Sequence, residues 1–104
     1  MYTIRPTLSY VQRVESIIKE LIETDRRSTA LQLQSAFLKF EEGIANQPQR
    51  WPRLDPGKLS DEFRVGKLLW FRIAYRIDDA STELYLLAIR HEKSSPSRLL
   101  DDVR

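Results

Sequence analysis

The sequence has no cysteine, a single histidine and only three glycines among its 104 residues. Without cysteine it forms no disulfide, thiol nucleophile or iron–sulfur site, and one histidine leaves only carboxylates for a metal. We therefore expect neither a metal nor a cofactor. Gly43, Gly57 and Gly66 lie too far apart for a phosphate-binding loop or a dinucleotide fingerprint. No serine lies in a glycine-flanked nucleophile turn. Nucleotide-dependent enzymes and serine hydrolases are thus disfavoured.

Long hydrophobic runs and a cleavable leader are also missing. We expect a cytoplasmic protein without membrane contact, folded as a single domain over residues 1–104. Seventeen Lys and Arg against fifteen Asp and Glu give a net charge of +2, which is too small to identify a polyanionic partner by itself. The placement of the charges is therefore more informative than their sum.

Residues 2–7 alternate and carry aromatic and β-branched side chains, which predicts a strand that stops near Pro6. Two helices follow, the first capped by Thr7 or Ser9 and the second by Ser28 or Thr29. Their apolar positions recur at three- and four-residue steps: Val11, Val14, Ile17, Ile18, Leu21 and Ile22 in the first, and Leu33, Ala36, Phe37, Phe40 and Ile44 in the second. We expect a helical hairpin.

A proline-rich loop is predicted between Asn46 and Gly57. Three segments rich in β-branched and aromatic residues come next, separated by turns at 66–67 and 78–82, and predict an antiparallel meander: Glu62–Val65, Leu68–Ile77 and Glu83–His91. The tail, residues 94–104, suits a frayed turn or a short helix. The fold class is therefore α+β: an N-terminal strand, a helical hairpin, then a three-stranded antiparallel meander in one small sheet. We expect the first strand to pair with a strand that does not follow it in sequence.

Alternation in the middle strand predicts one core face and one exposed basic face. Leu69, Phe71, Ile73, Tyr75 and Ile77 form the first; Trp70, Arg72, Ala74 and Arg76 form the second. Between Arg50 and Arg76, seven basic residues oppose three acidic ones, a local charge of +4. Such a face suits a phosphate backbone or an acidic peptide. The alternative is that these arginines pair with cross-strand acids such as Glu83.

His91, at the end of the last strand, has two interpretations. Its imidazole can act as an acid or base beside Arg90 and Glu92, or it can be a structural hydrogen-bonding residue. No second proton-transfer partner is evident in the sequence, which favours the structural role.

The stretch FRIAYRID at residues 71–78, followed by LLAIRH at 86–91 and then Pro96, resembles the C-terminal sheet of the RelE/ParE superfamily of type II toxin–antitoxin toxins. The first strand, the helical hairpin, the loop with Pro48 and Pro52, and the strand at residues 64–66 agree in order and length, so the resemblance covers nearly the whole chain. It implies a growth-inhibiting toxin that a cognate antitoxin binds and neutralises in a hetero-oligomer.

The resemblance implies one of two targets. RelE-like members cut messenger RNA at the ribosome, and the matching candidates for catalysis are Arg64, Arg72, Arg90 and His91. That branch also has a further basic residue and a tyrosine near its C-terminus, whereas here the strand is followed by EKSSPS and no tyrosine comes after Tyr85.

ParE-like members inhibit DNA gyrase and have no established catalytic residues of their own. Their ending is an apolar strand, a histidine and a proline five residues later, which His91 and Pro96 reproduce, although Ser94 stands where an arginine is common. The resemblance is therefore closer to ParE, and whether the chain is an enzyme stays open. A non-catalytic binding module that has lost its toxicity is the remaining alternative.

Two surfaces follow from this resemblance. The residues expected to bind the target or nucleic acid are Arg64, Lys67, Arg72, Arg76 and Lys93. Those expected to bind the antitoxin, along the margin of the first helix, are Leu8, Val11, Ile18 and Ile22. Antitoxins of this class wrap their toxin with an acidic, partly disordered segment that folds on binding.

Overall fold

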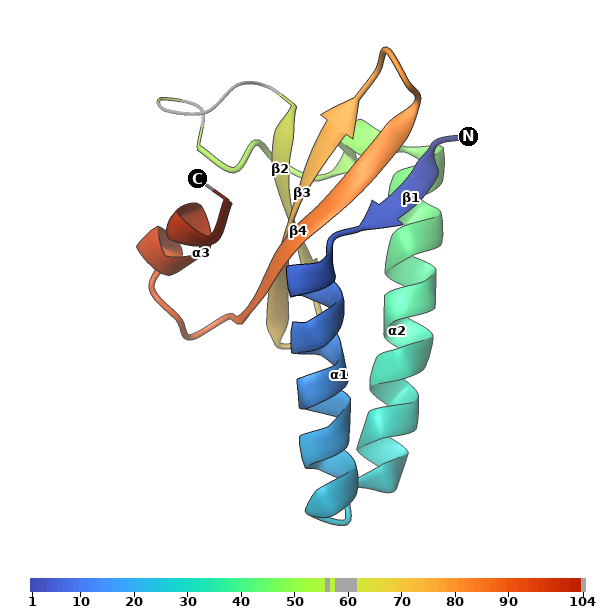
Figure 1. Cartoon of the computed structure of the whole chain (residues 1–104), viewed down its shortest axis with the longest axis vertical. Helices are drawn as coiled ribbons and strands as arrows, with labels where there is room; N and C mark the ends of the chain where they lie inside the picture. The colour runs from blue at the N-terminus through green and yellow to red at the C-terminus, as the bar shows by residue number, and fades with distance from the viewer. Residues whose placement is uncertain (56, 58–61, 104) are drawn as a thin grey trace.

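Over the residues that the computed structural model describes, the apolar stripes and alternating segments form three α-helices, one 3₁₀ helix and one four-stranded sheet (Figure 1). The structure describes residues 1–55, 57 and 62–103; four residues used in the loop, charge and tail predictions lie outside these ranges: Pro56, Lys58, Asp61 and Arg104. The elements are β1 (Thr3–Pro6), α1 (Leu8–Glu23), α2 (Arg27–Asn46), the 3₁₀ helix η1 (Pro48–Arg50), β2 (Phe63–Leu68), β3 (Phe71–Asp78), β4 (Glu83–His91) and α3 (Pro96–Val103). The α+β prediction is confirmed.

The sheet has the strand order β1-β4-β3-β2. The strands β2, β3 and β4 form the expected antiparallel meander, and β1 lies parallel to β4, with Ile4 beside Leu84. The prediction that β1 pairs with a non-sequential neighbour is confirmed. The helical hairpin α1–α2 is the connection that carries the chain from β1 to the rest of the sheet, and it extends well beyond the sheet edge (Figure 1).

Thr7 joins β1, α1 and β4. Its hydroxyl oxygen accepts a hydrogen bond from the Tyr10 backbone N–H at 3.3 Å, which caps α1 as predicted, and the same hydroxyl donates to the Leu86 carbonyl at 2.9 Å. The start of the hairpin is thereby attached to the sheet.

The predicted cap of α2 at Ser28 or Thr29 is wrong. The helix begins at Arg27 with Arg26 in the cap position and no side-chain cap hydrogen bond. Asp25 takes the left-handed backbone conformation (φ 61°), and the Arg26 N–H donates to the Leu21 carbonyl at 2.7 Å. This turn ends α1 so abruptly that α2 starts before either hydroxyl residue.

The predicted turn at residues 66–67 is also wrong, because β2 runs through it to Leu68. The turn is at Leu69 and Trp70, with Leu69 in the left-handed conformation (φ 52°). Gly66 lies within the strand and not in the turn, and it allows close packing of two aromatic rings. A Cβ at this position would lie 2.5 Å from the Phe40 ring and 3.0 Å from Trp51. Leu69 is therefore exposed in the turn instead of lying in the core.

The larger core lies between the helical hairpin and the facing side of the sheet. Its fully buried members include Leu33 and Ile44 of α2, Ile73 and Tyr75 of β3, and Leu84 of β4. We call this side of the sheet the helix face. Trp70 also packs against this core, so its predicted place beside Arg72 is wrong.

The opposite side, which we call the α3 face, was predicted to be exposed and basic, and that is only half correct. The α3 helix places Leu99, 4% exposed, against Ala74 and Ala88, and Val65 packs at the margin of this small cluster. The short helix is one of the two forms expected for the tail, but the alternation in β3 does not indicate that this helix covers the sheet. Among the described residues, no helix is long and apolar enough to span a membrane.

Candidate functional site

Three basic side chains line up across the α3 face of the sheet. Lys67 of β2 is the register partner of Arg72 of β3, which in turn is the partner of Arg90 of β4. Register partners in adjacent antiparallel strands project to the same face. We call these three residues the cationic row. It lies beside the Ala74–Ala88 cluster, at the end of the sheet where β4 leads into α3.

The two outer members of the cationic row have acidic partners. Lys67 Nζ lies 3.1 Å from Glu92 Oε2, and Arg90 donates to both carboxylate oxygens of Asp102 of α3, at 2.7 and 3.0 Å. These contacts hold the pKa values of Glu92 and Asp102 below their usual range. Arg72, between them, is exposed and forms no ion pair with any described residue. It is the member of the row that is available to an external anion.

Arg76 lies on the same face, farther along β3. The register shift between Ala74 and Tyr75 places Arg76 opposite Tyr85, and its guanidinium carbon lies 4.7 Å from the centre of that ring. Stacking on an aromatic face orients the guanidinium without neutralising it. Arg76 therefore adds a second, ordered positive charge to the α3 face.

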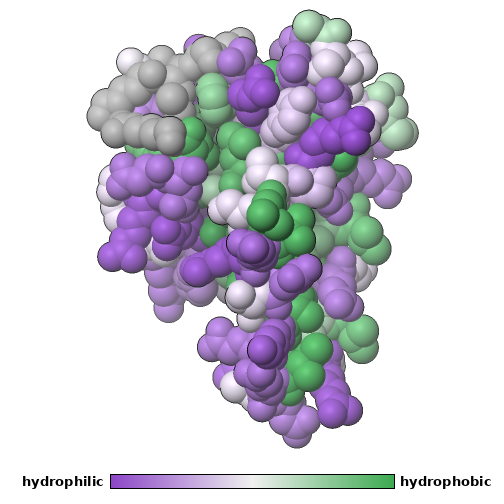
Figure 2. Space-filling view, in the orientation of Figure 1, coloured by the Kyte–Doolittle hydropathy of each residue, from purple (hydrophilic) through white to green (hydrophobic). Residues whose placement is uncertain are grey.

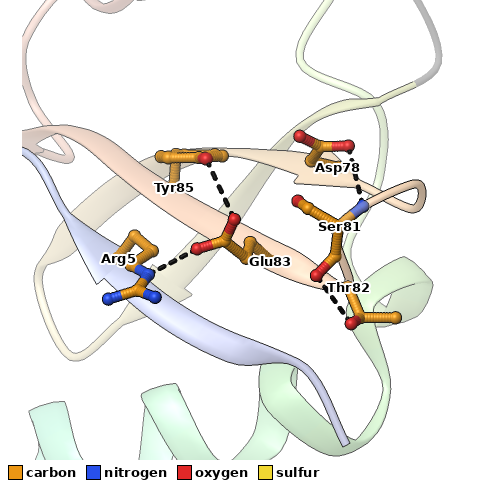
Figure 3. Close-up of polar contacts among 6 residues, drawn as sticks. All are labelled: Arg5, Asp78, Ser81, Thr82, Glu83 and Tyr85. Atoms are coloured by element: carbon orange, nitrogen blue, oxygen red, sulfur yellow. Dashed lines mark hydrogen bonds and ion pairs between the residues drawn. The ribbon is translucent and has the colours of Figure 1, made fainter.

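Glu83 pairs with Arg5 of β1 and not with the arginines of β3, so the cross-strand alternative raised by the sequence is wrong for this residue. Figure 3 shows Glu83 between Arg5 and Tyr85, whose hydroxyl donates to it at 3.3 Å. The hydrogen bond from Arg5 lowers the pKa of Glu83. Glu83 therefore neutralises Arg5 and not Arg72 or Arg76.

The structure brings three of the four candidate nuclease residues together. His91 lines a cavity of about 90 Å³ with Arg72 and Arg90, next to the turn that leads into α3. Arg64 does not join them, because its register partner is Tyr75 on the helix face, where it donates to the Trp51 carbonyl at 3.1 Å. The predicted grouping of Arg64 with Lys67, Arg72 and Arg76 is therefore split between the two faces.

Two contacts within the chain fix the position of the His91 ring. Its ring meets the Phe71 ring edge to face at 5.9 Å, and Nδ1 accepts a hydrogen bond from the Lys93 backbone N–H at 3.1 Å. The Lys93 side chain is exposed in the turn after β4, as a target-binding role requires. These contacts agree with the structural interpretation of the histidine.

The tryptophans do not form a stacking platform on the α3 face. Trp51 stacks on Phe40 at 6.1 Å, with the Arg50 guanidinium 5.6 Å from its ring centre. Tyr75 packs edge-on against the same Phe40 ring. Its hydroxyl donates to the Pro48 carbonyl at 2.6 Å, and burial raises the pKa of Tyr75 to about 12. These aromatic residues anchor the loop after α2 to the sheet.

An apolar groove of about 800 Å³ lies between α1 and α2. Of the four residues expected to bind an antitoxin, Ile18 and Ile22 line it, Val11 packs against the larger core, and Leu8 is 72% exposed at the start of α1. Figure 2 shows hydrophobic side chains flanked by hydrophilic ones along the hairpin, in the lower part of the view. Two of the four residues predicted to bind an antitoxin, Ile18 and Ile22, therefore lie in the groove, whereas Leu8 and Val11 do not line it.

Comparison with protein-family models and with curated protein sequences found no match to this chain. The resemblance to RelE/ParE toxins therefore stays a prediction that rests on the residues quoted for it.

Proposed function

We propose that this chain is the growth-inhibiting toxin of a bacterial type II toxin–antitoxin module, ParE-like, acting in the cytoplasm on DNA gyrase. The observation that supports this most is the arrangement of the elements. A first strand, a helical hairpin and a three-stranded meander, with β1 returned beside β4, is the order that the resemblance implies. The ending from His91 to Pro96 adds the ParE-like spacing.

The placement of the basic residues favours gyrase inhibition over messenger cleavage. In-line cleavage of RNA needs several cations and a proton-transfer group around one phosphate. Arg64 lies on the other face of the sheet, and the Nε–Nη2 edge of the Arg90 guanidinium is engaged by both carboxylate oxygens of Asp102. Arg72 is the member of the cationic row without an ion pair to a described residue, and a single unpaired guanidinium suits a binding contact better than transition-state stabilisation.

Arg72 and Arg76 are the residues that we expect to contact the target. Both present guanidinium groups on the α3 face, where they can bind carboxylates of gyrase or phosphates of its DNA. The Lys67–Glu92 pair borders this surface and is exposed to solvent, so screening makes it easy to exchange for a new partner. An acidic antitoxin segment over the same surface would neutralise the toxin by occupying it.

The test is induced expression of the chain alone in a bacterial host, followed by growth, plasmid supercoiling and messenger 5′ ends in one culture. We expect growth arrest with loss of negative supercoiling and no new messenger ends. Arg72→Ala should relieve the arrest while the protein keeps its circular dichroism spectrum. Arg27→Ala, an exposed arginine at the start of α2, is the matched control and should stay toxic.

Other outcomes identify the alternatives. Arrest with new messenger ends that disappear in Arg72→Ala would transfer the function to a RelE-like endoribonuclease and overturn the gyrase proposal. Unimpaired growth at high expression would contradict a toxin altogether and leave a binding module. Unchanged supercoiling by purified gyrase at saturating protein would count against a direct effect on that enzyme.

A further inference from the structure

The groove between α1 and α2 has an apolar floor. Along α1 its residues recur every four positions, at Tyr10, Val14, Ile18 and Ile22, so they form one continuous ridge. Phe37 of α2, which is buried, completes the floor. Such a row of side chains is the surface against which another helix packs its own ridges. From Tyr10 to Glu23 the groove runs about 20 Å, the length of about 14 helical residues.

The lips of the groove are acidic. Glu15 and Glu23 line it from α1 and Glu41 from α2, against a single basic residue, Lys19, which is paired with Glu23 at 3.8 Å. The other lip residues are Gln34 and the exposed Leu38. The groove therefore carries a net charge of −2, opposite in sign to the α3 face.

Among the acids that line the groove, Glu41 is the one whose charged form burial disfavours. It is half-buried at the groove, forms no ion pair with any described residue, and its pKa is raised because burial disfavours the charged form. A cationic side chain in the groove would stabilise this carboxylate in a partly desolvated position, where an ion pair is worth more than on an open surface.

We infer that the groove binds an amphipathic helix of about 14 residues from a different protein, with an apolar face on the α1 ridge and Lys or Arg side chains opposite Glu15, Glu23 and Glu41. This inference rests on the shape and charge of the groove and holds whether or not the chain is a toxin. If the proposed function is correct, the antitoxin would need a basic helix for this groove in addition to its acidic segment.

A second copy of the chain is a poor occupant. Two hairpins packed groove to groove would bring two grooves of net charge −2 together, and like charges in a partly desolvated interface oppose association. The short helix α3 does not fit either, because it carries Asp101 and Asp102 and its apolar Leu99 is buried on its own sheet. Charge complementarity therefore points to a basic partner.

The test uses purified full-length chain and two labelled synthetic peptides of equal length with the same leucine face. One carries lysines on both flanks of that face and the other carries glutamates there. We expect the lysine peptide to bind about tenfold or more tightly than the glutamate peptide at low salt in fluorescence anisotropy, with the preference shrinking as salt screens the charges. Glu41→Gln should reduce that preference.

Two leucines of α2 provide a matched pair of variants. Leu38 lines the groove and is 69% exposed, whereas Leu31 is 67% exposed and does not line it. Because both are on the surface, neither Leu38→Lys nor Leu31→Lys should unfold the chain. Leu38→Lys should abolish binding of the lysine peptide, and Leu31→Lys should leave it unchanged.

Three results would overturn the inference: no difference between the two peptides, absence of binding by both, or equal loss in Leu31→Lys and Leu38→Lys. Sedimentation of the chain alone adds a fourth, since a dimer that Leu38→Lys disperses and Leu31→Lys does not would make the groove a self-interface. Toxicity is measured in a separate experiment. A negative peptide-binding result therefore does not contradict the gyrase proposal, and a negative toxicity result does not contradict binding of a helix in the groove.

Discussion

The two faces of the sheet differ in the size of the side chains that they bury. The helix face buries large side chains, among them Ile73, Tyr75 and Leu84 at 0% exposure, under two long helices. On the α3 face, two alanines and Leu99 form the cluster, and the cationic row borders it. Hydrophobic stabilisation scales with the apolar area removed from water, so the helix face supplies most of it. The α3 face is thereby free to carry uncompensated charge.

The largest expected effect contrasts Ile73→Ala with Leu99→Ala. Ile73→Ala deletes buried atoms between rigid elements and should lower the free energy of unfolding by about 2–5 kcal/mol. Leu99→Ala can cost no more than the free energy with which α3 docks, because this eight-residue helix packs on the small cluster of the α3 face and can detach while the larger core stays folded.

Urea unfolding followed by tryptophan fluorescence measures both variants, and hydrogen exchange of the α3 amides reports its docking. Leu99→Ala should speed exchange in α3 alone. Equal losses of global stability in the two variants would mean that α3 is an integral part of one core, and the distinction between the faces would fail.

A smaller effect is expected at two glycines. Gly66→Ala puts a methyl group 2.5 Å from the Phe40 ring in the packed helix-face core and should destabilise by about 1–3 kcal/mol. Gly43→Ala meets only the guanidinium of Arg50 at 2.9 Å, the end of a flexible side chain, and it gains helix propensity of up to about 1 kcal/mol.

Thermal unfolding of the two alanine variants gives the comparison directly. The melting temperature should fall in Gly66→Ala and stay level or rise in Gly43→Ala. A harmless Gly66→Ala would show that the Phe40 ring has room to move, and that Gly66 is not required by packing.

Much of the fold follows from periodicity in the sequence. The helical stripes and the alternation in β3 and β4 determine which side chains can be buried together, and they predicted the hairpin and the meander. The long two-helix connection predicted that β1 pairs with a non-sequential strand, but not that this strand is β4. The turn between β2 and β3 was misplaced because Gly66 looks like a turn residue, whereas Leu69 adopts the positive φ that a β-branched or bulky residue rarely takes. The packing of Phe40 against Gly66 is a long-range contact with no local signal.

The sequence predicted the part of the candidate site that lies within one strand, but not the contacts between different elements. Arg72 and Arg76 were placed on one face by alternation within a single strand, and this is correct. Arg64 needed the register between two strands, which depends on the misplaced turn. Asp102 as the partner of Arg90 was missed, because their contact depends on how α3 folds back onto the sheet. The acidic lips of the groove were missed because Glu15 and Glu41 come from different helices.

The smallest expected effect concerns the contact that fastens α3 to the α3 face. The hydrogen bonds from Arg90 hold the pKa of Asp102 below its ordinary value. A carboxylate with a depressed folded-state pKa stabilises the folded state above the unfolded-state pKa of about 4, and this contribution is lost as the pH falls through the depressed value. Exchange protection of the α3 amides, corrected for intrinsic rates, should therefore be constant near neutral pH and decline below about pH 4.

Asp102→Asn removes the charge and should reduce α3 protection at neutral pH by up to about 1 kcal/mol, a limit set by the partial exposure of the pair. The acid-dependent decline should be absent from this variant. Asp25→Asn, in the exposed turn between α1 and α2, is the control and should retain both the protection and its pH dependence. If Asp102→Asn matched the unmodified chain at neutral pH, α3 would be held by Leu99 packing alone, and Arg90 would be available to a target together with Arg72.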